Sequence, residues 1–196
     1  MNKVMKVLLP LVLVVVLLAA SMPVFAAESP TTKAIDKVSV SSSTYNGKEQ
    51  TPTVKVFDAE GNKISSKYYK VKVSGTPKDA GSYKVTVTAK APYTGKKTAK
   101  FVIKKAMNPF TIKAGKTSFK QNKKKNQSTS IKVSGVKGGA KLGKWTSSTS
   151  KVYVKGSKLI IKKGFAGSAT IAVASQATKN YKYTRKTIKI VVKKKK

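Results

Sequence analysis

The sequence contains no cysteine and no histidine, and only six of its 196 residues are acidic. From Ala80 to Lys196 there is no aspartate or glutamate, against 30 lysines and one arginine, so this stretch carries a net charge of +31. General acid–base catalysis, metal binding and thiol chemistry draw mostly on the residue types that are scarce or missing here. The composition therefore argues against an enzyme, and we expect no catalytic residue, no cofactor and no metal site. It favours a polycation whose partner is negatively charged.

The lack of cysteine also excludes disulfides, so ordinary hydrophobic cores must stabilise the fold. The one long apolar run, Val7–Ala20, follows Lys3 and Lys6 and precedes a small-x-small site at Val24-Phe25-Ala26. This order is typical of a cleaved secretory signal peptide, which we place at residues 1–26. The alternative is an uncleaved anchor helix, but the run is shorter than the roughly 20 residues that span a bilayer. We expect a secreted, extracellular protein, loosely associated with the cell wall and without membrane insertion after cleavage.

After residue 26 the chain alternates apolar and polar residues over short segments, which is typical of β-strands. In Ser82–Ala89, for example, Tyr83, Val85 and Val87 fall on one face and Lys84, Thr86 and Thr88 on the other. Turn residues such as Asn46-Gly47 separate the segments. The strands that we expect are 37–40, 53–57, 69–73, 82–89, 97–103, 110–113, 130–133, 152–154, 158–161, 169–174 and 187–192. No stretch shows a sustained helical period, so we predict an all-β fold.

The charge balance changes near Lys104–Pro109. Residues 27–104 hold 15 lysines and all six acidic residues, a net charge of +9, whereas residues 105–196 hold 24 lysines, Arg185 and no acidic residue, a net charge of +25. Each half has enough strands for a small β-sandwich. We predict two tandem sandwich domains, 27–104 and a strongly basic 105–196.

The turn and core residues resemble those of known families. Thr44-Tyr45-Asn46-Gly47-Lys48 and Ala80-Gly81-Ser82-Tyr83 give the first half a resemblance to the immunoglobulin-like (Ig-like) repeats of bacterial cell-surface proteins. The second half resembles the group 2 bacterial Ig-like domain of adhesins through Trp145-Thr146-Ser147-Ser148 and residues 164–173. The resemblance implies two Ig-like β-sandwiches; such patterns specify a fold well and a function poorly.

Two lysine runs are the simplest contacts for a polyanion. One is Lys123, Lys124 and Lys125 on an expected loop, and the other is Lys193, Lys194, Lys195 and Lys196 at the C-terminus. Exposed strand faces add lysine ladders, as in Lys70 and Lys72. The alternative is that the lysines are solvated and keep the protein soluble. Because 41 lysines accompany one arginine, we expect diffuse, salt-sensitive binding with little stereospecificity.

The remaining candidates have structural explanations. Trp145 is expected to pack in or beside the second core, and tyrosines such as Tyr181 and Tyr183 could stack on sugars or bases but also suit sandwich edges. Asp58, Glu60 and Asn62 could hold calcium, although an ordinary hairpin turn explains them as well.

The sequence therefore supports a secreted, non-enzymatic bacterial Ig-like protein that associates electrostatically with anionic polymers, in an adhesion or attachment role. The partners that we expect are an anionic cell-wall polymer or glycan and, non-specifically, extracellular DNA. The alternative is a structural or spacer module with no specific ligand. A membrane-active cationic protein is disfavoured, because the apolar residues belong to strand cores.

Overall fold

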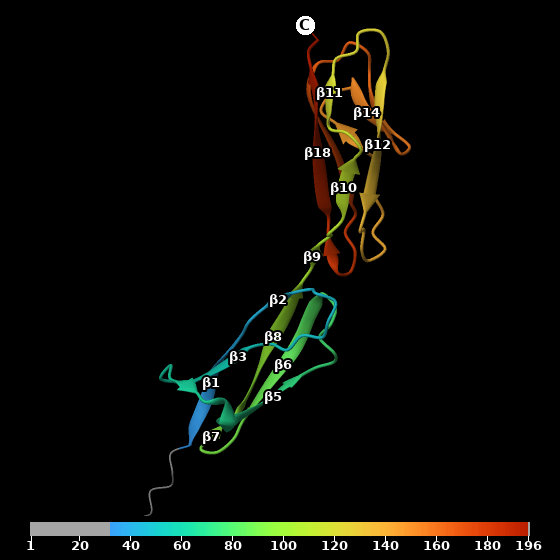
Figure 1. Ribbon diagram of the computed structural model, residues 1–196. Helices are drawn as coiled ribbons and strands as arrows, with labels where there is room; N and C mark the ends of the chain where they lie inside the picture. Colours follow the sequence, from blue (N-terminus) through green and yellow to red (C-terminus); the bar gives the residue numbers. More distant parts are fainter. Residues whose placement is uncertain (1–31, 196) are drawn as a thin grey trace, which may run out of the picture. The chain divides into compact units, whose positions relative to one another are not determined.

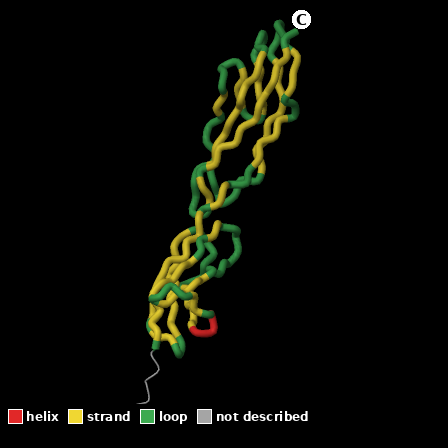
Figure 2. Tube along the Cα trace, turned by 90° about the vertical axis from the view of Figure 1, so that its left-hand side faces the viewer, coloured by secondary structure: helices red, strands yellow, loops and turns green. Residues whose placement is uncertain are grey.

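The computed structural model describes residues 32–195, which form strands and connecting loops (Figure 1). Within this range Figure 2 shows one short helical segment, the 3₁₀ helix η1 (Ser66–Tyr68). No helix among these residues has the length and hydrophobicity that a membrane span requires. The all-β prediction is confirmed, whereas the signal peptide at residues 1–26 and Lys196 lie outside the described residues.

The first sandwich consists of two four-stranded sheets. One has the order β4-β3-β1-β7, formed by Lys63–Ile64, Val54–Asp58, Lys33–Val40 and Tyr93–Thr94. The other has the order β2-β8-β6-β5, formed by Ser43–Thr44, Lys96–Lys104, Gly81–Ala89 and Tyr69–Val73. Most neighbouring strands are antiparallel, as in β6 and β8, where Gly81 pairs with Ile103 and Thr88 with Lys96.

Alternation along these strands builds the first core. In β6, Val85 and Val87 are fully buried, and Phe101 and Ile103 of the neighbouring β8 lie beside them. The buried set is Ile35, Val56, Ile64, Tyr69, Val85, Val87, Phe101 and Ile103. The face of β6 that was predicted to point inward does so.

The second sandwich repeats the plan. One sheet has the order β10-β12-β15-β14, formed by Thr111–Ala114, Gln127–Ser134, Lys158–Ile161 and Val152–Lys155. The other has the order β11-β18-β16-β13, formed by Ser118–Lys120, Thr184–Lys193, Gly167–Ser175 and Thr146–Ser147. Strands β16 and β18 pair over nine residues, from Gly167 opposite Val192 to Ser175 opposite Thr184.

The second core shares no residue with the first. Its buried set is Phe119, Ile131, Val152, Leu159, Ile161, Ala169, Ile171, Ile190 and Val192. Trp145 is half-buried and packs against this core, as expected from the sequence. Two tandem β-sandwiches are therefore present; the boundary between residues 104 and 105 remains a prediction.

Where the two sandwiches meet, β9 (Ala106–Met107) pairs with β17 (Tyr181–Lys182). Asp79 of the first sandwich accepts hydrogen bonds from Lys179 Nζ at 2.5 Å and Asn180 Nδ2 at 2.9 Å. The ring of Tyr45 meets that of Tyr181 edge-on, with centroids 5.4 Å apart. We call these contacts the junction; they use polar and aromatic groups and no continuous apolar core.

All eleven strands expected from the sequence are present. Seven further strands of two or three residues were not expected: β2, β4, β7, β9, β11, β13 and β17. Segments this short carry too few residues for an alternating pattern, and their pairing partners lie far away in the sequence.

Candidate functional site

The fold gathers the two predicted lysine runs at the C-terminal end of β18. In Figure 1 this end, drawn red, lies beside β11, whose last residue leads into the loop that carries the first run. A third lysine-bearing segment, the turn after β15, joins them. We call these exposed residues the terminal lysine cluster: Lys120, Lys123, Lys124, Lys125, Lys162, Lys163, Lys193, Lys194 and Lys195.

Gln121 connects all three segments of the terminal lysine cluster. Its backbone N–H donates to the carbonyl of Lys193 at 2.8 Å, and its side-chain Oε1 accepts from the N–H of Lys195 at 3.3 Å. Its Nε2 donates to the carbonyl of Gly164 at 2.7 Å. One neutral side chain thus fixes the loop against both the C-terminal strand and the turn after β15.

Two asparagines complete the framework. Asn122 Oδ1 accepts from the backbone N–H groups of Lys124 and Lys125, both at 3.0 Å, which shapes the loop as an Asx turn. Asn126 Oδ1 accepts from the N–H of Lys163 at 2.9 Å. The backbone of the cluster is therefore organised, while its lysine side chains remain exposed.

No carboxylate side chain neutralises the terminal lysine cluster. Residues 80–196 contain no acidic side chain, and the ion pairs among residues 32–195 use Glu60, Asp36 and Asp79. Coulomb attraction between exposed charges is screened over about 8–10 Å at physiological salt. The cluster is suited to contacts with several closely spaced anionic groups, at an affinity that depends on salt.

Of the predicted site residues, Lys123–Lys125 and Lys193–Lys195 thus come together, and Lys196 lies outside the described residues. Sequence reasoning did not single out Lys162 and Lys163. The sequence does show this lysine pair just before the turn residue Gly164. The pair joins the cluster through tertiary hydrogen bonds, from the Gly164 N–H to the carbonyl of Asn122 and from the Lys163 N–H to Oδ1 of Asn126. Nothing in the local sequence identifies these partners.

The outer face of the β2-β8-β6-β5 sheet carries a second cationic surface, which we call the lysine–threonine face: Lys70, Lys72, Lys84, Thr86, Thr88, Lys96, Thr98 and Lys100. The predicted ladder of Lys70 and Lys72 is exposed, as expected. Val71 between them is also 42% exposed, because β5 lies at the edge of its sheet. A hollow of about 380 Å³ lies on this face, and Lys72, Lys84 and Lys96 are among its lining residues.

One pairing on the lysine–threonine face places like charges together. Lys84 and Lys100 are directly opposite each other in β6 and β8. Like charges at directly opposite positions destabilise a sheet, because their Cβ atoms lie only about 5 Å apart.

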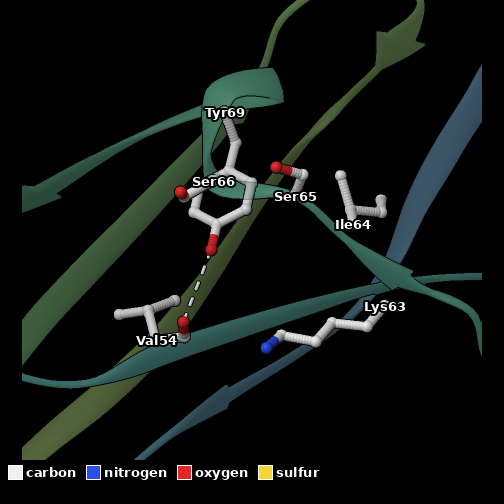
Figure 3. Close-up of a pocket in the computed structure, with 6 residues that line it drawn as sticks. All are labelled: Val54, Lys63, Ile64, Ser65, Ser66 and Tyr69. Atoms are coloured by element: carbon white, nitrogen blue, oxygen red, sulfur yellow. Dashed lines mark hydrogen bonds between the residues drawn. The ribbon is translucent and has the colours of Figure 1, made fainter.

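A hollow of about 480 Å³ opens beside β3 and β4 and is shown in Figure 3. Tyr69 lines it and donates its hydroxyl to the carbonyl of Val54 at 3.4 Å. Its other lining residues are Lys63, Ile64, Ser65 and Ser66, so Lys63 contributes the single charge. This hollow does not gather a charged or catalytic group of residues.

Asp58, Glu60 and Asn62 lie at the turn where the sequence allows a calcium site. Asp58 Oδ1 accepts from the backbone N–H of Asn62 at 2.7 Å, and Oδ2 accepts from the Asn62 side chain at 3.3 Å. Burial raises the pKa of Asp58, but the hydrogen bonds from Asn62 and the charge of Lys33 outweigh it, and the pKa lies below its ordinary value. Glu60 pairs with Lys33 at 3.4 Å. Both carboxylates thus have protein partners, as in an ordinary hairpin turn, and residues 32–195 contain no group of three or more His, Cys, Asp and Glu side chains that could hold a metal ion.

In a comparison with known families, residues 37–107 match the model of the MBG domain family. The match covers most of the first sandwich. The resemblance of the first half to Ig-like repeats of bacterial surface proteins is confirmed. No curated protein matches the chain.

Solved structures that align with the chain include domains of a surface layer protein and immunoglobulin domains. Domains 1–6 of surface layer protein SbsC align with a TM-score of 0.31 and 16% identity, over 84% of this chain and 29% of that one. SbsC domains 4 and 5 align with a TM-score of 0.30 and 15% identity, over 82% and 98% of the two chains. Sidekick-1 immunoglobulin domains 1–4 align with a TM-score of 0.35 and 10% identity, over 81% of this chain and 49% of that one. The chain thus spans less than a third of the length of the first of these structures.

Proposed function

We propose that this protein is a non-enzymatic bacterial surface protein that attaches electrostatically to an anionic polymer of the cell envelope or its surroundings. Wall teichoic acid, an anionic glycan and extracellular DNA all have the required repeating negative charge. The observation that carries the proposal is the terminal lysine cluster, nine exposed lysines on a hydrogen-bonded framework in a region without a single acidic side chain. The MBG match of residues 37–107 supports the surface role.

The proposed attraction is electrostatic, so its signature is the dependence on salt. A polycation that neutralises several phosphates releases their counterions, and the logarithm of the affinity falls linearly with the logarithm of the salt concentration. Each lysine that contacts a phosphate of duplex DNA contributes about 0.9 to the slope. Lysine provides charge without the planar fork of arginine, so unrelated polyanions should bind similarly.

The test compares two triple variants of the chain from Ala27 onward that lose the same charge. One changes Lys123, Lys124 and Lys125 to glutamine, and the matched control changes the exposed Lys55, Lys63 and Lys90 of the first sandwich. Affinities for wall teichoic acid, heparin and duplex DNA are measured between 50 and 300 mM NaCl. We expect the cluster variant to lower the slope on DNA by up to about 3 and the control to change it less. Salt-independent binding, or equal effects of the two variants, would contradict the proposed role of the cluster.

A second candidate function is a structural or spacer module with no ligand. One observation favours it: proteins that recognise phosphate or carboxylate groups often use arginine, and this chain has 41 lysines and one arginine. If none of the three polymers binds at 50 mM NaCl, the lysines serve solubility and this second function holds.

A further inference from the structure

A separate hollow lies on the outer face of the β11-β18-β16-β13 sheet, where β13 forms the edge. Its volume is about 220 Å³, and its lining residues include Lys144, Thr146, Ala174, Gln176, Tyr183 and Arg185. The register contributes to the depression, because Ala174 of β16 lines the hollow and is directly opposite Arg185 of β18. The small side chain of Ala174 leaves space beside the longer side chains of Arg185 and of Thr146 on β13.

Arg185 is the one arginine among the 42 basic residues of the chain. Its guanidinium makes no hydrogen bond or ion pair with any of residues 32–195, although it offers five donors in a planar fork. A diffuse positive surface has no need of such a fork, because lysine supplies the same charge. A fork in a hollow is suited to two parallel hydrogen bonds with one carboxylate.

Tyr183 lies on the same side of the chain, two residues before Arg185. It is 61% exposed, whereas each of the other seven tyrosines is buried or half-buried. An exposed tyrosine presents a flat apolar face together with a polar hydroxyl. Such a face suits the C–H surface of a sugar ring, and Thr146 and Gln176 add polar groups that can bond to sugar hydroxyls.

We propose that this hollow binds one carboxylated sugar unit, a hexuronate, of an acidic polysaccharide. Arg185 holds the carboxylate through both branches of its guanidinium, Lys144 adds a second positive charge, and the ring of Tyr183 stacks on the sugar. A cavity of about 220 Å³ is smaller than the 300–1,000 Å³ that drug-sized ligands occupy, which favours a single sugar unit. The inference does not rest on the terminal lysine cluster, because it concerns local recognition and not diffuse attraction.

The test uses the chain from Ala27 onward and tri-galacturonate as the probe, titrated at 150 mM NaCl by calorimetry and by amide NMR. Arg185→Lys keeps the charge and removes the fork, and we expect it to weaken binding at least tenfold. Tyr183→Leu should weaken binding at least fivefold, whereas Tyr183→Phe, which keeps the ring, should stay within threefold. The matched control is Lys189→Gln on the same strand, opposite Thr170, which removes a charge and should change affinity less than twofold.

Three outcomes would overturn the proposal. Arg185→Lys could bind like the unmodified protein, the methyl-esterified trimer could bind as well as the free acid, or a dinucleotide could bind more tightly than the trimer. Raising NaCl to 0.5 M separates the two proposals, because it removes diffuse binding and should leave the NMR shifts near Arg185 and Tyr183. If no polymer binds in a salt-dependent way, the proposed function fails while this test still gives its own answer. Unchanged melting temperatures confirm that the variants fold.

Discussion

The two sandwiches are built alike inside and differently outside. Each has two four-stranded sheets around a core of alternating aliphatic and aromatic side chains. The first carries all the acidic side chains of the described residues, and two of its lysines form ion pairs, Lys33 with Glu60 and Lys97 with Asp36. The second has no acidic side chain, and Gln121, Asn122 and Asn126 fix its lysine-rich loops. Neutral amides thus order a backbone without neutralising the lysines on it.

This difference also separates how the two regions respond to pH. Carboxylates titrate near pH 4, and lysine, arginine and tyrosine side chains titrate near pH 10 or above. The second sandwich has no carboxylate side chain, whereas the first carries Asp36, Glu49, Asp58, Glu60 and Asp79, so a change of pH in the acidic range acts on the side chains of the first. Three predictions test this comparison, and the first concerns the hydrophobic core, which has the same construction in both sandwiches.

The largest expected effect is on stability, because the two cores have the same construction. Ile103 in the first core and Ile171 in the second are 2% and 0% exposed. Changing either to alanine should lower the free energy of unfolding by about 2–5 kcal/mol, through lost burial and the cavity that remains. Thermal unfolding of the second sandwich is followed by the fluorescence of Trp145, the only tryptophan, which packs on the second core. Thermal unfolding of the first sandwich is followed by methyl NMR.

If the cores are independent, Ile171→Ala shifts the Trp145 transition and Ile103→Ala does not. Ile171→Val is the control and should lower the free energy of unfolding by only about 0.5–1.5 kcal/mol. A single shared transition that both alanine variants shift equally would show that residues 32–195 unfold as one unit.

The second prediction concerns the amide framework and polymer binding. Asn122 and Asn126 use only their Oδ1 atoms as acceptors in the bonds described, so Asn122→Asp and Asn126→Asp keep those bonds while adding two negative charges. The double variant should fold normally, weaken binding to duplex DNA at least about tenfold near 100 mM NaCl, and lower the salt slope by about 2.

The matched control is Asn46→Asp in the first sandwich, where Oδ1 accepts from the N–H of Lys48 at 2.9 Å. This site lies on a turn outside the terminal lysine cluster, so the control should change the slope by less than about 1. Equal changes per added charge at both places would mean that net charge alone, and no particular surface, governs attachment.

The sequence predicts the long strands well and the assembled surfaces poorly. Alternation places Val85 and Val87 in the core, because the two-residue period of a strand is a local property. The sequence also identifies Lys123–Lys125 as exposed. It cannot predict that Gln121 bonds to Lys193 and Gly164, because these contacts depend on the register of β11 against β18.

The same reason explains why the sequence alone does not identify Arg185 as a binding residue. Its surroundings depend on the register that sets Ala174 opposite it and on the course of residues 143–146 along the sheet edge. The composition contains one usable signal, a single arginine among 41 lysines, but that signal gives no location.

The smallest expected effect is at the junction, where an acidic side chain of the first sandwich meets the second. The hydrogen bond from Lys179, then that from Asn180, lowers the pKa of Asp79 below its ordinary value of 3.8. A carboxyl group whose pKa is lowered on folding stabilises the native state above its unfolded pKa, and this contribution is lost as pH falls through the folded pKa. Between pH 5 and 2 the N–H of Ala80, which donates to Asn180 Oδ1 at 2.8 Å, should therefore shift in NMR spectra. The N–H groups of Lys124 and Lys125 should not, because their acceptor is an amide. The effect on stability should be small, since ion pairs at the surface contribute little.

Asp79→Asn should abolish the titration at Ala80 and leave that of the Asn62 N–H, which reports on Asp58. If Lys124 and Lys125 titrate with Ala80, the pH response of the first sandwich reaches the terminal lysine cluster, and the two regions are not electrostatically separate.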